Sequence, residues 1–190
     1  MTIQQMMLGG GASAPPFVPV TRSYTSGSGT ETAPAGCSNV VIECWGAGGT
    51  GGTGATNPSG FGGGGGGGGG YSKTTVAIVG SQTLLYDLTA GSSVSSGTKT
   101  ITTMTANAGG TGGAGATFSA GTGGTGGTAS GGTDTNSTGG AGTAGDQPDG
   151  GYGGTPAVSG SGAGVGGDGG AAPNGPGASG TAGKITFSYT

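Results

Sequence analysis

The sequence predicts an all-β fold in which short strands are interrupted by bundled glycine helices, with almost no α-helix. Glycine makes up 56 of the 190 residues, and from Gly109 to Gly175 it occupies 15 of the 23 positions at three-residue steps. Three residues per turn is the period of polyproline II geometry, whereas an α-helix repeats every 3.6 residues and a strand every two. Between the glycine blocks, apolar and polar residues alternate in the manner of strands.

Glycine mixed with Ser and Thr is also typical of flexible linkers and disordered tracts. The regular spacing of glycine at every third residue favours an ordered structure instead. It leaves one side of each helix without side chains, so that a neighbouring backbone can approach closely. Nine prolines are too few for collagen, the other three-residue repeat. Polyproline II leaves its N–H and C=O groups free, so buried ones need partners on neighbouring segments.

The clearest strands lie on either side of the glycine blocks. Residues 21–45 are predicted as β structure, and at 39–45 the residues Val40, Ile42 and Cys44 share one face. Trp45 ends this strand and is expected to fill the core. Further strands are expected at 71–78, 82–89, 98–105 and 184–190. In the last of these, Ile185, Phe187 and Tyr189 share a face.

The glycine blocks at 46–70 and 107–183 are interrupted by residues that reverse a chain. The breaks lie at 56–59, 116–120, 129–138, 146–149, 155–159 and 171–174. They divide the blocks into about eight short helices. Up-and-down traversal then places 116–120, 146–149 and 171–174 at one end of the bundle, and 129–138 and 155–159 at the other.

The first 20 residues are predicted to be a separate docking peptide, and residues 21–190 a single glycine-rich domain. The peptide has few contacts of its own, and its exposed apolar side chains favour docking on another protein. A flexible terminus is the alternative. The candidate docking residues are Ile3, Met6, Met7, Leu8 and Phe17.

Composition argues against most kinds of chemistry. The chain has no histidine and only four Lys and Arg, with a net charge of −3, so neither catalysis nor nucleic-acid binding is expected. The acidic residues near 134 and 168 occur singly, which argues against a calcium site, and no cofactor is expected. Cys37 and Cys44 are too far apart along the chain to pair if 39–45 is a strand. Neither a signal peptide nor a membrane-inserted segment is expected.

Breaks between glycine helices are the expected place for recognition, because loops on a rigid scaffold tolerate change. Phe118 could stack on a sugar, and Asp134 and Asn136 could form hydrogen bonds with one. Tyr152 is a further aromatic surface candidate. These four residues are the candidate receptor-contact residues.

The ordered series of motifs resembles the glycine-rich domains of phage tail and receptor-binding proteins. The resemblance rests on the run from Cys37 through Trp45-Gly-Ala-Gly-Gly, the block Gly62–Gly70 followed by Tyr71-Ser-Lys, the glycine tract, and the final Lys184-Ile-Thr-Phe-Ser-Tyr. It covers residues 22–190. It implies a small β-sandwich with an inserted bundle of polyglycine II helices, which in related adhesins carries receptor-contacting loops at one end.

The resulting functional hypothesis is a non-enzymatic phage virion protein, either a tail-associated fibre or an adhesin. A capsid decoration or head-fibre protein without receptor binding is the alternative, favoured by breaks that consist mostly of Thr, Ser, Asn, Asp and Ala. The expected partners are other virion proteins, bound through the N-terminal peptide, and a host surface glycan or outer-membrane protein. The expected location is the virion, with several copies per particle, assembled in the bacterial cytoplasm.

Overall fold

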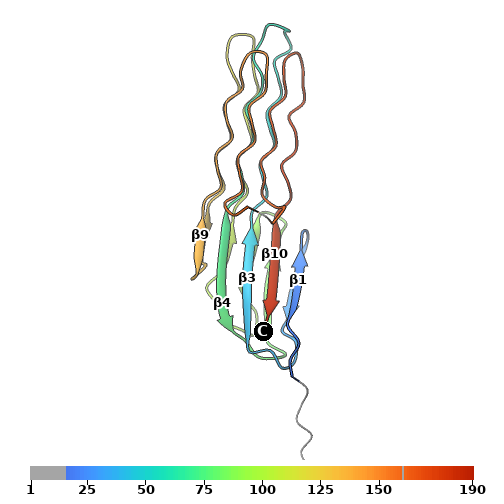
Figure 1. The fold of residues 1–190 in the computed structure, drawn as a ribbon, viewed down its shortest axis with the longest axis vertical. Coiled ribbons are helices and arrows are strands. Elements are labelled where there is room, and N and C mark those ends of the chain that lie inside the picture. Colours follow the sequence, from blue (N-terminus) through green and yellow to red (C-terminus); the bar gives the residue numbers. More distant parts are fainter. Residues whose placement is uncertain (1–15, 160) are drawn as a thin grey trace, which may run out of the picture.

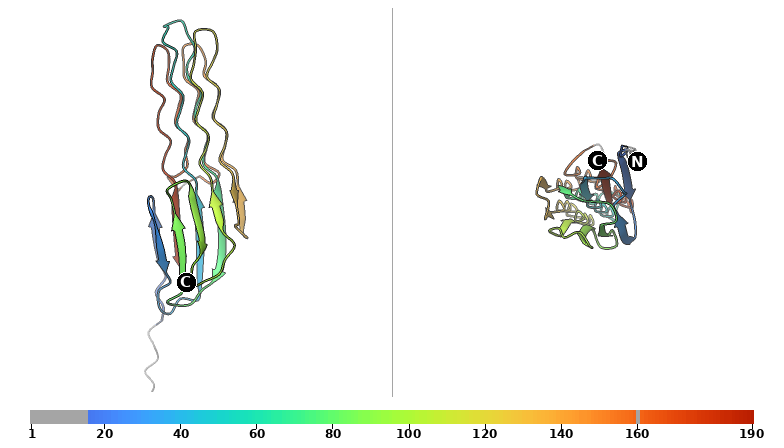
Figure 2. Two further views of the ribbon diagram at one scale, coloured as in Figure 1. Left: turned by 180° about the vertical axis from the view of Figure 1, so that it is seen from behind. Right: turned by 90° about the horizontal axis from the view of Figure 1, so that it is seen from below.

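The computed structural model describes residues 16–159 and 161–190. Within these residues there are ten β-strands and no helix, so the prediction of an all-β fold is confirmed. The strands form two antiparallel sheets at one end of an elongated molecule, and the glycine-rich segments extend from the sheets to form the other end (Figures 1 and 2). Ile3, Met6, Met7 and Leu8 lie outside the described residues.

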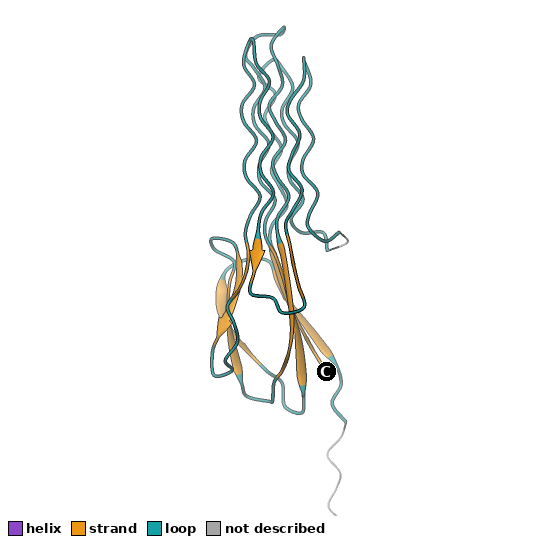
Figure 3. Cartoon of the chain, turned by 90° about the vertical axis from the view of Figure 1, so that its left-hand side faces the viewer, coloured by secondary structure: helices purple, strands orange, loops and turns teal. Residues whose placement is uncertain are grey.

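The two sheets have five strands each and face one another as the layers of a sandwich (Figure 3). The first has the order β1-β10-β3-β4-β9, with β1 at Val20–Tyr24, β10 at Lys184–Tyr189, β3 at Asn39–Trp45, β4 at Tyr71–Ala77 and β9 at Thr135–Ser137. The second has the order β2-β5-β6-β7-β8, with β2 at Ser28–Thr32, β5 at Thr83–Asp87, β6 at Ser92–Ser96, β7 at Met104–Ala106 and β8 at Ala129–Ser130.

Strand β3 coincides with its expected range, and β4, β5 and β10 are shorter than expected by one to three residues. The strand expected at 98–105 is wrong for most of its length, because only Met104–Ala106 forms β7. Residues 97–103 instead connect β6 to β7. The hydroxyl of Ser96 accepts a hydrogen bond from the N–H of Ile101 and donates one to its carbonyl, each at 3.0 Å.

The apolar core lies between the two sheets. Val40, Ile42 and Cys44 of β3 pair in register with Tyr189, Phe187 and Ile185 of β10, and all six side chains are buried. Leu84, Val94 and Met104 cover them from the second sheet. The alternation in sequence thus correctly predicts which face of both strands is inside.

Consecutive strands that belong to different sheets close the sandwich at its two edges. On one edge β1 joins the first sheet and β2 the second, and β8 and β9 divide in the same way on the other edge. Glu31 of β2 is 2% exposed and accepts hydrogen bonds from Arg22 (2.6 Å), Tyr24 (2.5 Å) and Tyr189 (2.9 Å). The hydrogen bond to Glu31, reinforced by burial, raises the pKa of Tyr24 to about 12. A buried carboxylate with three donors therefore holds β2 against β1 and β10.

Both cysteines are free and buried. Burial raises the pKa of the Cys44 thiol to about 12, so it carries almost no thiolate at neutral pH. The thiol of Cys37 lies 3.8 Å from the carbonyl oxygen of Ile78. Both side chains act as small core residues.

The glycine-rich region, which we call the shaft, comprises residues 46–70, 107–128 and 139–183. It consists of eight extended segments that run alternately away from the sheets and back (Figure 1). The central segment is 61–70, the six surrounding segments are 46–55, 107–115, 121–128, 139–146, 149–157 and 163–171, and the outer segment is 175–183.

Every N–H group from Gly62 to Gly70 donates a backbone hydrogen bond of 2.7–3.0 Å. In strict rotation, these groups donate to the segments 139–146, 163–171 and 107–115. The carbonyl groups of the central segment accept, in the same rotation, from the other three surrounding segments. All nine glycines are buried. A run of nine consecutive glycines is needed here because backbone lies against every side of this segment.

The surrounding segments are hydrogen-bonded to one another in a closed ring, and each has three kinds of position. In segment 139–146, a Cβ at Gly142 would overlap the carbonyl group of Gly65 in the central segment. Thr143 is hydrogen-bonded to the next segment through Tyr152, whereas Ala144 faces solvent. Glycine therefore recurs where backbone opposes backbone, and side chains occupy the outward positions.

Candidate functional site

The turns at the far end of the shaft form a continuous surface, which we call the tip. It consists of residues 56–60, 116–120, 146–149 and 171–174. Backbone hydrogen bonds join Phe61 to Ala116 (3.1 Å), Ala172 to Pro148 (2.8 Å) and Asn174 to Ala55 (2.7 Å). The side-chain amide of Gln147 donates to the carbonyl of Ser59. The tip is therefore a set of turns that hold one another in place by hydrogen bonds. The up-and-down path predicted from the sequence correctly places three of these four turns at the same end.

One large aromatic side chain stands out from this surface. Phe118 is 93% exposed, an unusual state for a phenylalanine because most of its apolar area remains in water. Around it the turns expose short polar side chains and two carboxylates, Asp146 and Asp149. No Lys or Arg occurs in the shaft. The tip thus offers an apolar anchor within an acidic, hydrogen-bonding rim.

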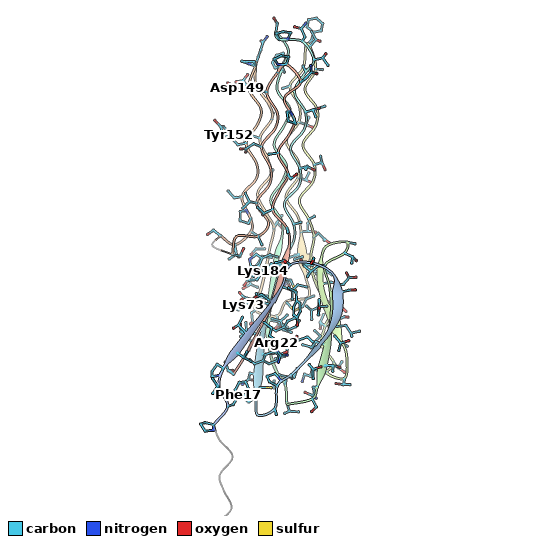
Figure 4. The ribbon with its side chains drawn as sticks, turned by 90° about the vertical axis from the view of Figure 1, so that its right-hand side faces the viewer. Phe17, Arg22, Lys73, Asp149, Tyr152 and Lys184 are labelled. Atoms are coloured by element: carbon cyan, nitrogen blue, oxygen red, sulfur yellow. The ribbon has the colours of Figure 1, made fainter. Side chains whose placement is uncertain are left out.

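The other predicted contact residues lie away from Phe118. Tyr152 is 76% exposed and lies on the flank of the shaft, below Asp149 (Figure 4). Asp134 lies in the β8–β9 connection and Asn136 in β9 itself, at the edge of the sandwich. The four residues therefore do not form one site.

The hydrogen-bonding capacity of Asp134 and Asn136 is largely used within the protein. Asp134 accepts hydrogen bonds from Thr75 (2.7 Å) and Thr133 (3.3 Å). The Asn136 amide bonds to Ser72 and to both backbone groups of Gly132. Asn136 thus shapes the connection between β8 and β9, which its sequence position alone does not reveal.

The base of the molecule, opposite the tip, is where the described chain begins. Phe17 is half-buried against the core and packs on Gly36, and Val20 is the first residue of β1. The sandwich therefore begins before residue 21, and Phe17 is already engaged within the protein. Val18 and Val79 remain 77% and 59% exposed nearby.

Trp45 seals the junction between sandwich and shaft. It is 7% exposed and packs against Tyr71, with ring centroids 5.2 Å apart, and against Ala163. Its indole N–H is buried without a hydrogen-bond partner among the described residues. The expectation that Trp45 fills a core is confirmed, although this core is a small second cluster.

Among residues 16–159 and 161–190, no three His, Cys, Asp or Glu side chains gather as a metal site. No helix in this part of the chain has the length and apolar character needed to cross a membrane.

Comparison with models of protein families finds no match. Comparison with curated proteins likewise finds no protein of significant sequence similarity.

Proposed function

We propose that the eight shaft segments are polyglycine II helices packed in a hexagonal bundle. The three-residue rotation of hydrogen bonds around the central segment supports this assignment, because a three-residue turn directs successive N–H groups in three directions. The closed ring of six surrounding segments supports it further. In this arrangement backbone hydrogen bonds, rather than an apolar core, hold the shaft together.

Hydrogen exchange followed by NMR tests this assignment. We expect slow exchange for all amides from Gly62 to Gly70. Within segment 139–146, Gly142 and Thr143 donate to neighbouring segments, whereas the Ala144 N–H has no acceptor within the described chain. Slow, slow and fast exchange should therefore repeat every three residues. Uniform protection along this segment, or fast exchange in the central one, would contradict the bundle.

We further propose that the protein is a non-enzymatic phage virion component, a tail-associated fibre or adhesin. The observation that carries this proposal is that the elongated molecule has two different ends. A shaft built from backbone hydrogen bonds holds the braced turns of the tip far from the base, where the described chain begins and ends (Figure 1). Such a molecule is suited to attachment at its base, through the residues that precede Phe17, and to contact at its tip.

Substitution in the tip tests the adhesin role. We expect replacement of Thr117-Phe118 by Gly-Ser to lower adsorption of particles to host cells at least tenfold, because the exposed aromatic anchor is lost. The turn itself should survive, because Ala116 and Ser119 are joined through their backbones. Adsorption rate and copy number per particle would be measured together.

The matched control is Tyr152→Ser, which removes an exposed aromatic ring from the flank of the shaft. It should leave adsorption unchanged. If both variants assemble and adsorb normally, the adhesin role is wrong, and a capsid decoration or head-fibre protein becomes the better assignment. The small number of exposed aromatic side chains on the shaft favours that alternative.

A further inference from the structure

A groove of about 410 Å³ lies on the outer face of the first sheet, beside the junction with the shaft. Strands β1, β10 and β3 form its floor, and residues 158, 159 and 161 form part of its wall. The groove lies at the opposite end of the shaft from the tip.

The groove is lined mainly by hydroxyl groups. Antiparallel pairing sets Thr21 opposite Ser188 and Ser23 opposite Thr186, so that alternate outward residues form adjacent rows. The hydroxyls of Thr21 and Ser188 lie 3.0 Å apart. Ser159 adds a further hydroxyl from the wall. Each hydroxyl can both donate and accept, which suits a ligand that is itself rich in hydroxyls.

One cation and one carboxylate lie in the groove, and they differ in how many polar partners they have within the protein. Glu43 accepts hydrogen bonds from Tyr71 (2.6 Å) and Thr186 (3.4 Å). Lys184 has no carboxylate within salt-bridge distance among the described residues. Its ammonium lies 5.7 Å from the centroid of the Trp45 ring, and Figure 4 shows it at the junction with the shaft. A half-buried ammonium held over an aromatic ring remains available to an anion.

We propose that this groove binds an acidic saccharide, a sugar that carries a carboxylate. The carboxylate pairs with Lys184, and the ring hydroxyls form hydrogen bonds with the floor hydroxyls of Thr21, Ser23 and Ser188. Val158 and the edge of Trp45 supply the apolar surface that a sugar ring packs against. This site is independent of the tip and of the position of the protein on a particle.

Titration of the full chain with digalacturonate, followed by NMR, tests the proposal. We expect chemical-shift changes confined to Thr21, Ser23, Ser159 and residues 184–188. Lys184→Met should weaken binding at least tenfold and leave the rest of the spectrum unchanged. The matched control is Lys73→Met, which removes the same charge from the same outer face, two strands away on β4 and outside the groove. This variant should bind as the parent does.

Three results would overturn the proposal. The first is the absence of shift changes at millimolar digalacturonate. The second is equal weakening by Lys73→Met, which would mean that binding follows surface charge alone. The third is equal binding of a triglutamate peptide, which carries carboxylates but no ring hydroxyls.

Discussion

Gly66→Ala is expected to destabilise the protein by at least about 3 kcal/mol, the upper part of the range for overpacking. Gly66 lies in the middle of the central segment, where its N–H donates to Gly167 (2.8 Å) and its carbonyl accepts from Gly154 (2.7 Å). A methyl group there would overlap the carbonyl of Gly49. Because surrounding segments enclose the site on all sides, the backbone has no direction in which to relax. Thermal or denaturant unfolding measures the loss.

Ala144→Val is the control for this substitution, because it adds a larger volume at a position that faces solvent. Its effect should stay within about 0.5 kcal/mol, as is usual for surface changes. Comparable destabilisation by both variants would mean that the shaft does not depend on close approach of backbones.

Phe187→Ala should cost about 3–5 kcal/mol of unfolding free energy, a large share of the total of about 5–15 kcal/mol for a typical domain. The ring is fully buried and meets Tyr24 and Tyr86 edge-on, at centroid distances of 6.1 and 6.5 Å. It also lies opposite Ile42 in the register of β3 and β10. Its removal leaves a cavity at the centre of the sandwich.

The same substitution at the tip, Phe118→Ala, provides the control, because that ring is 93% exposed. Its unfolding free energy should equal that of the parent protein. A Phe187→Ala variant as stable as the Phe118→Ala variant would show that the two sheets do not depend on each other for stability.

The parts of the fold that could be predicted from the sequence are those governed by local periodicity. Alternation in β3 and β10 identifies both the strands and their buried faces, because only inward positions carry large apolar side chains. Glycine at every third residue identifies the shaft, because a side chain does not fit where two backbones meet. Breaks that contain Pro, Asn or Asp correctly predict the turns at 146–149 and 171–174, since these residues favour chain reversal. The break predicted at 129–138 instead contains the strands β8 and β9.

Other parts depend on contacts that are distant in the sequence. Strand β6 has the sequence Ser-Ser-Val-Ser-Ser, so one buried valine is its only apolar signal. Residues 98–103 are rich in Thr and β-branched side chains, yet they form a connection, because the short β7 lies further along. The central place of Gly62–Gly70 also could not be predicted, since its partners extend to residue 170.

The candidate site was predictable only in part. The exposure of Phe118 and Tyr152 agrees with their place among small residues, which cannot cover an aromatic ring. The turn at 56–60 also belongs to the tip, and its Asn-Pro sequence is the same signal that marked the other turns. The groove around Lys184 escaped sequence reasoning, because it combines outward residues of three strands with a distant loop.

Successive N–H groups of the central segment donate in turn to three different neighbouring segments. The length of the shaft therefore depends on all of its segments together. Deleting one residue from 61–70 would turn every later N–H by one third of a revolution, away from its acceptor. In the polyglycine II bundle that we propose, length can therefore change only in whole turns of three residues, about 9.3 Å, and each surrounding segment must change with the central one. A longer or shorter shaft requires coordinated insertions at sites spread over more than 100 residues of sequence. The distance from the base to the tip can thus change only in fixed steps, and a small insertion in a single segment cannot adjust it.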